Sequence, residues 1–284
     1  MTTAPPGASM GNCISRCCTS GSSTRHRSNP AKLAAPTNSR QHAYERNRIL
    51  NGQNCNGAND GLNVTGDVSA TEGGVGNEAE AERALLDLYD RYKDTEDINC
   101  ILADGCERLC FDLDLKPDDF RVLVLAHALN ASSMCCFTKA EFLNGGRKLG
   151  VHSIGGFKSV IPSLINNLIC DKISFKIFYK WTFSYGLESG QRSLSIEMAL
   201  VLWPLIFTEN EPAILKPWLL FLEKSSSVRA IARDTWDMFL NLVEQVGDDL
   251  SAYDESEAWP SLFDDFVEWE NDRKNQNVSE DVQI

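Results

Sequence analysis

Apolar side chains recur with helical spacing along most of this chain, beginning near Glu78. Leu85, Leu88, Tyr89 and Tyr92 fall on one face of a first helix. The period-two alternation that marks a half-buried strand does not occur over any useful length. The pattern therefore predicts an all-α fold of roughly nine or ten helices joined by short connections.

Capping residues and prolines predict where several helices begin and end. Pro117 fits a first turn and is followed by two acidic residues that suit the positive end of a helix dipole, so a helix is expected from there to about Asn130. Thr138 and Glu141 form a capping box for a helix that Gly150 closes. Further helices are expected at residues 102–113, 153–169, 175–181, 196–207, 212–224 and 232–246, with a last short helix opening at Pro260.

The first quarter of the chain differs in composition from the rest. Residues 1–77 are rich in Gly, Ser, Asn, Thr and Pro and have no apolar periodicity. Such a segment cannot bury enough surface to offset its ordering entropy, so we expect a disordered N-terminal arm. A single helical domain is expected over residues 78–272, in two lobes that meet near Asp171, followed by a flexible tail at residues 273–284.

Charge divides the chain in the same place. The arm carries seven Lys or Arg and four Asp or Glu, which leaves 20 basic and 36 acidic residues, a formal charge of −16, for the remainder. This acidic balance argues against a nucleic-acid-binding domain and favours basic partners. The longest clean apolar run, residues 199–207, is too short to cross a bilayer. Ten cysteines without a secretory segment indicate reduced thiols in the cytosol.

A lipid-attachment motif stands near the start of the arm. Residues 10–15 read Met-Gly-Asn-Cys-Ile-Ser, which fits the myristoylation pattern, with Gly11 as the acceptor. Because nine residues precede Met10, acylation requires translation from Met10 or proteolytic exposure of Gly11. Stable anchoring needs a second signal, and the candidates are three palmitoylatable cysteines, Cys13, Cys17 and Cys18, with arginines nearby. If the arm is acylated, we expect the protein at the cell membrane; otherwise we expect it in the cytoplasm or nucleus. The alternative is that the motif matches the myristoylation pattern by chance.

An EF-hand calcium site is a second candidate, because residues 94–99 begin like a calcium-binding loop. Counting from Asp94, the fifth position is Ile98 where an oxygen ligand is needed, the sixth is Asn99 rather than Gly, and the twelfth is Gly105 rather than Glu. A degenerate, EF-hand-like helix pair without metal is the better interpretation. An acylated calcium sensor, or another membrane-tethered helical module, stays open as the rival function.

A thiol or zinc centre is a third candidate, although no Cys-x-x-Cys pair occurs among its residues. Cys106 and Cys110, one helical turn apart, have the spacing of small apolar core residues. A Cys/His nucleophile remains an alternative, but we predict no catalytic residue, metal or resident cofactor. The cysteines and histidines concerned are Cys106, Cys110, Cys135, Cys136, Cys170, His127 and His152.

The most informative segment is an acidic run near the C-terminus. Residues 234–272 contain thirteen Asp or Glu and no Lys or Arg, interleaved with Trp236, Trp259 and Trp269. A charge run is usually a solvated face. The tryptophans instead favour an ordered acidic surface with an apolar edge, which suits docking of a basic partner.

Several motifs in this run and upstream of it occur together in one known family. Over residues 78–269 the chain resembles the defective-in-cullin-neddylation family, whose fold is the potentiating-neddylation domain. The Met-Gly-x-Cys segment and long arm resemble its acylated, membrane-associated branch. The motifs that carry the resemblance are Leu-Tyr-Asp-Arg-Tyr-Lys-Asp at 88–94, Phe-Thr-Lys-Ala-Glu-Phe at 137–142, Phe-Tyr at 178, Thr-Phe at 182, Glu-Met-Ala at 197, Asp-Thr-Trp at 234, Tyr-Asp-Glu at 253, Ala-Trp-Pro at 258 and Asp-Asp-Phe-Val-Glu at 264.

The resemblance implies a scaffold-type cofactor of cullin neddylation rather than an enzyme, one that promotes or spatially regulates transfer of the ubiquitin-like modifier. Cullins with their ring-type subunit would bind Asp234, Ala258 and Asp264. The N-terminally acetylated Met of the conjugating enzyme would enter an apolar pocket, where acetylation removes an ammonium charge that is costly to bury. The residues implied for that pocket are Ala103, Cys106, Val122, Leu125, Ala126, Leu129, Cys135, Phe137, Tyr185, Leu202 and Leu205.

Overall fold

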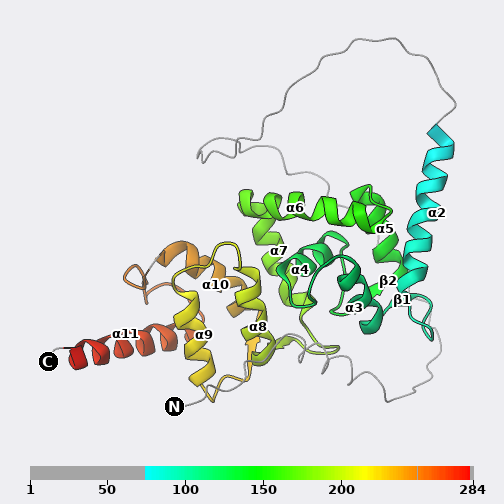
Figure 1. The fold of residues 1–284 in the computed structure, drawn as a ribbon. Helices are drawn as coiled ribbons and strands as arrows, with labels where there is room; N and C mark the ends of the chain where they lie inside the picture. Colours follow the sequence, from blue (N-terminus) through cyan, green and yellow to red (C-terminus); the bar gives the residue numbers. More distant parts are fainter. Residues whose placement is uncertain (1–73, 248, 282–284) are drawn as a thin grey trace, which may run out of the picture.

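The computed structural model describes the backbone of residues 74–247 and 249–281, and in this part of the chain ten helices and four short strands occur (Figure 1). The all-α prediction is confirmed. The acylation motif at residues 10–15 lies outside the described residues. Among the described residues, no helix is long and apolar enough to span a membrane.

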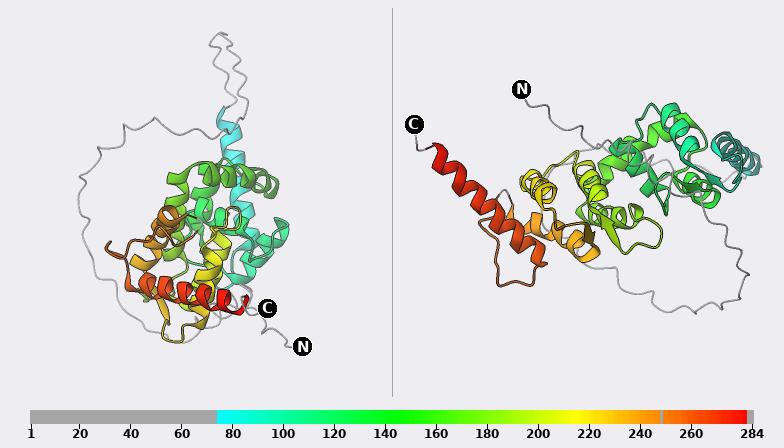
Figure 2. Two further views of the ribbon diagram at one scale, coloured as in Figure 1. Left: turned by 90° about the vertical axis from the view of Figure 1, so that its left-hand side faces the viewer. Right: turned by 90° about the horizontal axis from the view of Figure 1, so that it is seen from below.

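Two sets of helices lie on either side of α7 (Figures 1 and 2). The first set is α2 (Gly74–Tyr92), α3 (Ala103–Asp112), α4 (Phe120–Ala128), α5 (Lys139–Leu149) and α6 (Ile154–Cys170). After α7 (Lys172–Tyr185) come α8 (Ile196–Ile206), α9 (Leu215–Lys224), α10 (Arg233–Val246) and α11 (Ser261–Asp281).

Four short strands, which the sequence did not predict, tie the helix pairs together. β1 (Cys100–Ile101) pairs antiparallel with β2 (Phe137–Thr138), and β3 (Ser193–Ser195) pairs antiparallel with β4 (Ala230–Ala232). Each strand has two or three residues, too few for an alternating pattern to be recognised.

Helix boundaries follow the capping chemistry of the sequence, with one correction. The capping box of Thr138 and Glu141 is present, and Gly150 ends α5 in the left-handed conformation at φ 67°. Pro117 is not in the first turn of α4. That helix starts at Phe120, because the Asp119 side chain accepts a 2.8 Å hydrogen bond from the Arg121 amide and so acts as the N-cap.

Two further expectations differ from the structure. Leu102, expected on the apolar face of its helix, is the N-cap of α3 and is 37% exposed. The helix expected to be short after Pro260 is α11, which has 21 residues and enters the segment expected to be a flexible tail. The spacing of residues alone does not show whether a residue at a helix end is a cap or a core position, or how far the last helix continues.

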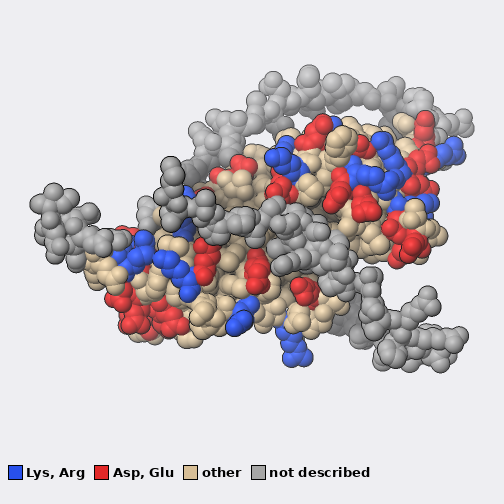
Figure 3. All heavy atoms as spheres, turned by 60° about the horizontal axis from the view of Figure 1, so that its bottom comes forward, with Lys and Arg blue, Asp and Glu red and all other residues tan. Residues whose placement is uncertain are grey.

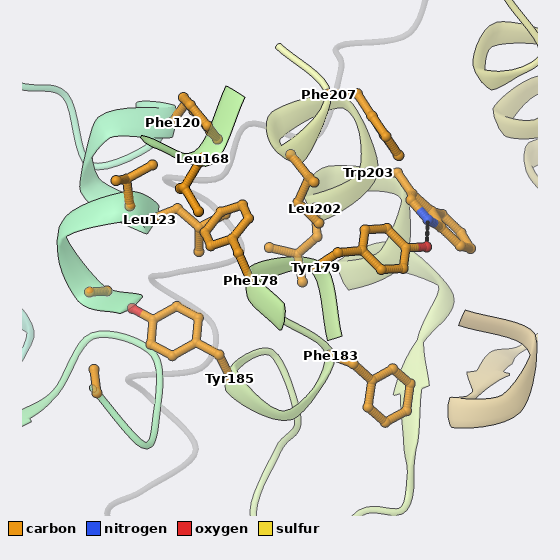
Figure 4. Close-up of a cluster of buried hydrophobic side chains, with 14 of the residues drawn as sticks. Phe120, Leu123, Leu168, Phe178, Tyr179, Phe183, Tyr185, Leu202, Trp203 and Phe207 are labelled. Atoms are coloured by element: carbon orange, nitrogen blue, oxygen red, sulfur yellow. Dashed lines mark hydrogen bonds between the residues drawn. The ribbon is translucent and has the colours of Figure 1, made fainter. Parts of the chain in front are cut away.

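The core is continuous through α7 (Figure 4). Phe178 points toward Phe120 of α4 with ring centroids 6.0 Å apart, whereas Tyr179 points toward α8. The Tyr179 hydroxyl accepts a 2.9 Å hydrogen bond from Trp203 Nε1 and donates one of 2.8 Å to the Trp236 carbonyl. The buried face of α7 therefore packs against both sets.

Candidate docking surfaces

An apolar hollow opens beside α3 and α4. The volume that it encloses is about 50 Å³, which is room for a small apolar group. Its walls come from α3, α4, the segment before β2, the end of α7 and α8. The lining residues are Ala103, Cys106, Glu107, Leu109, Cys110, Leu113, Pro117, Asp119, Val122, Leu123, Leu125, Met134, Cys135, Phe137, Tyr185 and Leu205.

Asp234, Ala258 and Asp264 are all exposed, on α10, on the loop before α11 and on α11. Asp234 stands in the first turn of α10, where the partial positive charge of the helix end favours a carboxylate. Asp264 accepts a 2.6 Å hydrogen bond from the Tyr253 hydroxyl. Asp264 also lines a second hollow, formed with Glu255, Val267, Glu268, Asn271 and Asp272.

A chain of aromatic contacts connects the helices that carry these acids. Its members pack at centroid distances between 4.6 and 6.1 Å, so α10, α11 and the loop between them share one support. Figure 3 shows Asp and Glu side chains gathered at the end of the molecule that carries the C-terminus. In order, the contacts join Trp236, Trp203, Trp218, Phe263, Trp259 and Tyr253.

Comparison with known proteins identifies the family. A family profile described as cullin binding matches residues 156–269, which contain all but the last three residues of the acidic run. DCN1-like protein 3 of Rattus norvegicus is 38% identical over 289 residues, covering 95% of this chain and 94% of its own length. The chain belongs to the DCN1-like family. DCN1-like protein 3 of Xenopus tropicalis is 47% identical over 216 residues, and that of Homo sapiens 45% over 216, covering 75% and 74% of this chain and 71% and 70% of their own lengths.

In this DCN1-like chain, the structure brings eight of the eleven residues implied for the apolar pocket together around the hollow. Ala126, Leu129 and Leu202 are almost fully buried core residues and do not line it. The eight that line it are Ala103, Cys106, Val122, Leu125, Cys135, Phe137, Tyr185 and Leu205.

The resemblance missed eight residues that line the hollow. Leu109, Cys110 and Leu113 follow Cys106 by three, four and seven residues, so the helical spacing already placed them on one face of α3. Nothing in the sequence indicated the remaining five, because they depend on how α3, α4 and the loops between them pack. These are Glu107, Pro117, Asp119, Leu123 and Met134.

Apart from the exposed Glu107, the polar groups of the hollow are uncharged or paired. Burial raises the pKa of the Cys110 thiol to about 11 and that of the Tyr185 hydroxyl well above its ordinary value. Arg121 lowers the pKa of Asp119 through two side-chain hydrogen bonds of 2.9 and 2.5 Å, so this carboxylate already has a cationic partner. Glu107 is exposed. A ligand inside the hollow therefore meets a largely neutral surface.

Two of the cysteines considered as alternative nucleophiles, Cys110 and Cys136, are disfavoured as thiolates. Burial is the main cause that raises the pKa of Cys136 to about 11, and the neighbouring Cys100 adds to it. A cysteine nucleophile needs a lowered thiol pKa so that the thiolate forms. The surroundings of Cys136 raise its pKa and therefore oppose thiolate formation. The conclusion agrees with the sequence interpretation of Cys110 as a core residue.

The loop considered for calcium uses its carboxylates to satisfy backbone amides. Asp94 Oδ1 accepts hydrogen bonds of 2.8 Å from the Glu96 amide and 2.9 Å from the Asp97 amide. Asp97 Oδ1 in turn accepts one of 3.0 Å from the Asn99 amide. In the described residues no group of three or more His, Cys, Asp or Glu side chains is placed to hold a metal ion.

The tryptophans of the acidic run differ in burial. Trp236 is fully buried, stacked on Tyr179 at 5.2 Å and on Trp203 at 4.6 Å. Trp259 and Trp269 are half-buried. Trp236 therefore supports the acidic surface from the core, while the half-buried Trp259 and Trp269 are available for its apolar edge.

Proposed function

We propose that this protein is a scaffold-type cofactor of cullin neddylation. It binds a cullin together with its ring-type subunit through the acidic surface on α10 and α11, and it binds the neddylation conjugating enzyme through the apolar hollow. The observation that carries the proposal is the match of a cullin-binding family profile to residues 156–269, which include Asp234, Ala258 and Asp264.

Charge and rigidity support the assignment of the acidic surface to the cullin. Residues 234–272 contain thirteen acidic and no basic residues, so a basic surface of the partner is attracted and acidic competitors are repelled. The aromatic contacts below Asp234 and Asp264 reduce the conformational entropy that docking would otherwise cost. Ala258 has the smallest side chain of the three and allows a partner to approach the loop closely.

The chemistry of the hollow supports an acetylated N-terminal Met as its ligand. Its lining is largely apolar, and Asp119 is already paired with Arg121. Burying an ammonium group without a partner costs several kcal/mol, whereas an N-acetyl group carries no charge. An uncharged, blocked methionine terminus therefore suits the apolar lining of the hollow.

Such a scaffold accelerates transfer without forming a covalent intermediate. Holding the charged enzyme and the cullin on one protein raises their effective concentration and restricts the orientation of the thioester toward the acceptor lysine. The raised thiol pKa values of Cys110 and Cys136 support a non-catalytic role.

Titration of the scaffold into a reconstituted transfer reaction tests this mechanism. A bivalent scaffold produces a bell-shaped rate curve, because excess scaffold places the enzyme and the cullin on separate molecules. A rate that rises to a plateau and stays there at excess scaffold would contradict bivalent docking. Mutation of Cys136, which does not line the hollow, to Ala is expected to leave the bell shape intact.

We also propose that the arm attaches the protein to the cell membrane by myristoylation of Gly11 and palmitoylation of Cys13, Cys17 and Cys18. The motif supports this proposal because one acyl chain binds weakly and neighbouring cysteines and basic residues supply the second signal. Mass spectrometry of the cellular protein and fractionation of Gly11→Ala test it. An unmodified Gly11 in a soluble wild-type protein would contradict it.

A further inference from the structure

Two cysteine thiols meet where β1 and β2 pair. Cys100 starts β1 and lies opposite Thr138 of β2, and Cys136 stands two residues before Thr138. A side-chain hydrogen bond joins the thiols of Cys100 and Cys136, and both residues are reduced and half-buried. The two sulfur atoms are therefore already in contact, although they come from segments far apart in the sequence. Only a short approach separates them from the ~2 Å length of an S–S bond.

This thiol pair adjoins the wall of the apolar hollow. Cys135 and Phe137, on either side of Cys136, line the hollow, whereas Cys136 does not. Cys135 has the left-handed backbone conformation at φ 56°, and β1 and β2 share two residue pairs. A short strand pair thus holds this wall to β1, so a movement of Cys136 is passed on to the lining residues beside it.

The hydrogen bond between the thiols gives them different roles. It lowers the pKa of Cys100 and raises that of Cys136, as expected when the Cys136 thiol donates to the Cys100 sulfur, so Cys100 is the sulfur that attacks first. Burial, and then Asp97, still raises the pKa of Cys100 above its ordinary value, and burial raises that of Cys136 to about 11. Scarce thiolate slows exchange with other disulfides. The reduced pair also lacks the stabilised thiolate that makes a disulfide easy to reduce.

We propose that Cys100 and Cys136 are a modification site, at which a low-molecular-weight disulfide such as oxidised glutathione produces a reversible protein disulfide. The Cys100 thiolate attacks the glutathione disulfide, forms an S–S bond with one half and releases the other half as a thiolate. Cys136 then loses its proton to water and attacks the Cys100 sulfur of this mixed disulfide, which releases the second glutathione thiolate.

The electrons and protons of this exchange balance. The protein gives up two electrons and two protons, and one oxidised glutathione is reduced to two thiols. Contact between Cys100 and Cys136 makes the second step intramolecular, which offsets the small thiolate fraction of Cys136.

Closure of the disulfide is expected to weaken ligand binding in the hollow. Bond formation draws Cys136 toward β1, so Cys135 and Phe137 leave the positions in which they line the hollow of the reduced protein. Disulfides of cytosolic proteins are usually transient and redox-sensing, which fits the reduced pair as the resting form. This consequence rests on the proposed binding of an acetylated N-terminal Met, whereas the disulfide itself does not.

Equilibration of the full-length chain in glutathione buffers of increasing oxidised fraction tests the site. After free thiols are alkylated and the protein is digested, mass spectrometry is expected to show peptides joined through Cys100 and Cys136, which dithiothreitol separates. Cys136→Ser should keep glutathione on Cys100, whereas Cys100→Ser should leave Cys136 largely unmodified, because attack starts at Cys100. Cys170→Ser, at an exposed cysteine on α6, is the matched control and should keep the linked peptides.

Two physical measurements on the same samples follow the consequences. The oxidised wild type should unfold several degrees above the reduced wild type, because the disulfide closes a loop in the unfolded chain, and Cys136→Ser should show no such shift. By fluorescence anisotropy, the oxidised wild type should bind the acetylated peptide more weakly than the reduced form by roughly threefold or more, and dithiothreitol should restore the affinity.

Absence of the linked peptides in buffers that attach glutathione to Cys170 would overturn the proposal. A disulfide from Cys100 or Cys136 to another cysteine in their place would overturn it as well. Equal peptide affinity of the reduced and oxidised protein would overturn the coupling to the hollow. Failure of the reduced protein to bind the peptide contradicts the proposed function instead, and the two failures are distinguishable because the disulfide is detected by mass rather than by binding.

Discussion

The hydroxyl of Tyr253 donates a 2.6 Å hydrogen bond to Oδ1 of Asp264, joining the loop before α11 to the first turn of that helix. The same ring stacks on Trp259 with centroids 5.7 Å apart. Burial, and then the bond to Asp264, raises the pKa of Tyr253 well above its ordinary value, so the phenol stays protonated and keeps donating. One acid of the proposed cullin contact is thus fixed by an aromatic residue outside the implied triplet.

Replacement of Tyr253 by Phe tests this positioning role. The stack on Trp259 is kept and the hydrogen bond is lost, so Asp264 gains rotamer freedom that docking must then remove. We expect cullin affinity to fall by roughly 3- to 10-fold, the equivalent of about 1 kcal/mol for one hydrogen bond. Isothermal titration calorimetry with a cullin C-terminal fragment measures the change.

Asp264→Asn is the matched comparison, because it keeps an acceptor for Tyr253 and removes the charge. If charge dominates, the Asn variant binds more weakly than Tyr253→Phe and its affinity depends less steeply on salt than that of the wild type. Wild-type affinity in both variants would exclude this pair from the interface.

The apolar hollow is expected to discriminate between two forms of one peptide. An N-terminally acetylated peptide of the conjugating enzyme should bind at least tenfold more tightly than the free amine, because the ammonium must be desolvated in a largely neutral site. Fluorescence anisotropy with the two peptides gives the ratio. Equal affinities would rule out the hollow as an acetyl-methionine site.

Glu107 offers a control for that experiment. It lines the hollow and is exposed, so its carboxylate can attract a free ammonium but gains nothing from an acetyl group. Glu107→Gln is expected to leave acetylated-peptide binding unchanged and to weaken binding of the free amine. A weaker acetylated complex would mean that Glu107 contacts the ligand directly.

His127 should make stability depend on pH. Its ring packs against Phe178 at 5.3 Å and Trp181 at 4.9 Å, and burial, with a smaller effect of Lys148, lowers its pKa below 6.5. The unfolded chain therefore binds the proton more readily, so the free energy of unfolding falls as pH drops through about 6.5 toward the folded pKa.

Urea denaturation at pH 7.5 and at pH 5.5 measures this effect. His127→Gln should reduce the difference in stability between the two pH values, whereas His152→Gln, at an exposed position, should behave like the wild type. Identical pH dependence of the wild type and His127→Gln would show that His127 is not the group responsible.

Tyr179 is expected to be the most costly hydroxyl to remove. Tyr179→Phe leaves Trp203 Nε1 without its acceptor inside the core, whereas the Trp236 carbonyl loses one of its donors but keeps the helical hydrogen bond of α10. A buried polar group left unpaired costs about 1–3 kcal/mol, so the free energy of unfolding should fall by roughly that amount. Chemical denaturation tests this, with Tyr253→Phe as the comparison near the surface. A change below about 1 kcal/mol would mean that the core rearranges to satisfy Trp203 Nε1.

Helical spacing and capping residues were sufficient to predict most of the architecture. The Thr138 box and Gly150 predicted the ends of α5, because these signals act within a few residues. The start of α4 was placed too early at Pro117, since a proline in a first turn and a proline just before an N-cap look alike in sequence. The strands were too short to leave a pattern.

Only part of the candidate site could be predicted, because its lining depends on how segments far apart in the sequence pack together. Cys106, Leu109, Cys110 and Leu113 share a face that spacing reveals, but whether that face meets the core or a hollow depends on α4 and α8. The exposure of Ile173 on α7 was also missed, because isoleucines at helical spacing usually indicate a buried face. Long-range packing, which single-sequence patterns do not contain, decides both cases.

The most direct test of the central claim is the affinity of the full-length chain for a cullin C-terminal domain, measured by calorimetry for the wild type and for the combined variant Asp234→Ala, Ala258→Arg, Asp264→Ala. A control variant, Glu188→Ala with Glu209→Ala, removes two exposed acids outside the run. We predict that the combined variant loses detectable binding with its thermal unfolding unchanged, while the control binds like the wild type. Wild-type affinity in the folded combined variant would contradict the assignment of the acidic surface to the cullin.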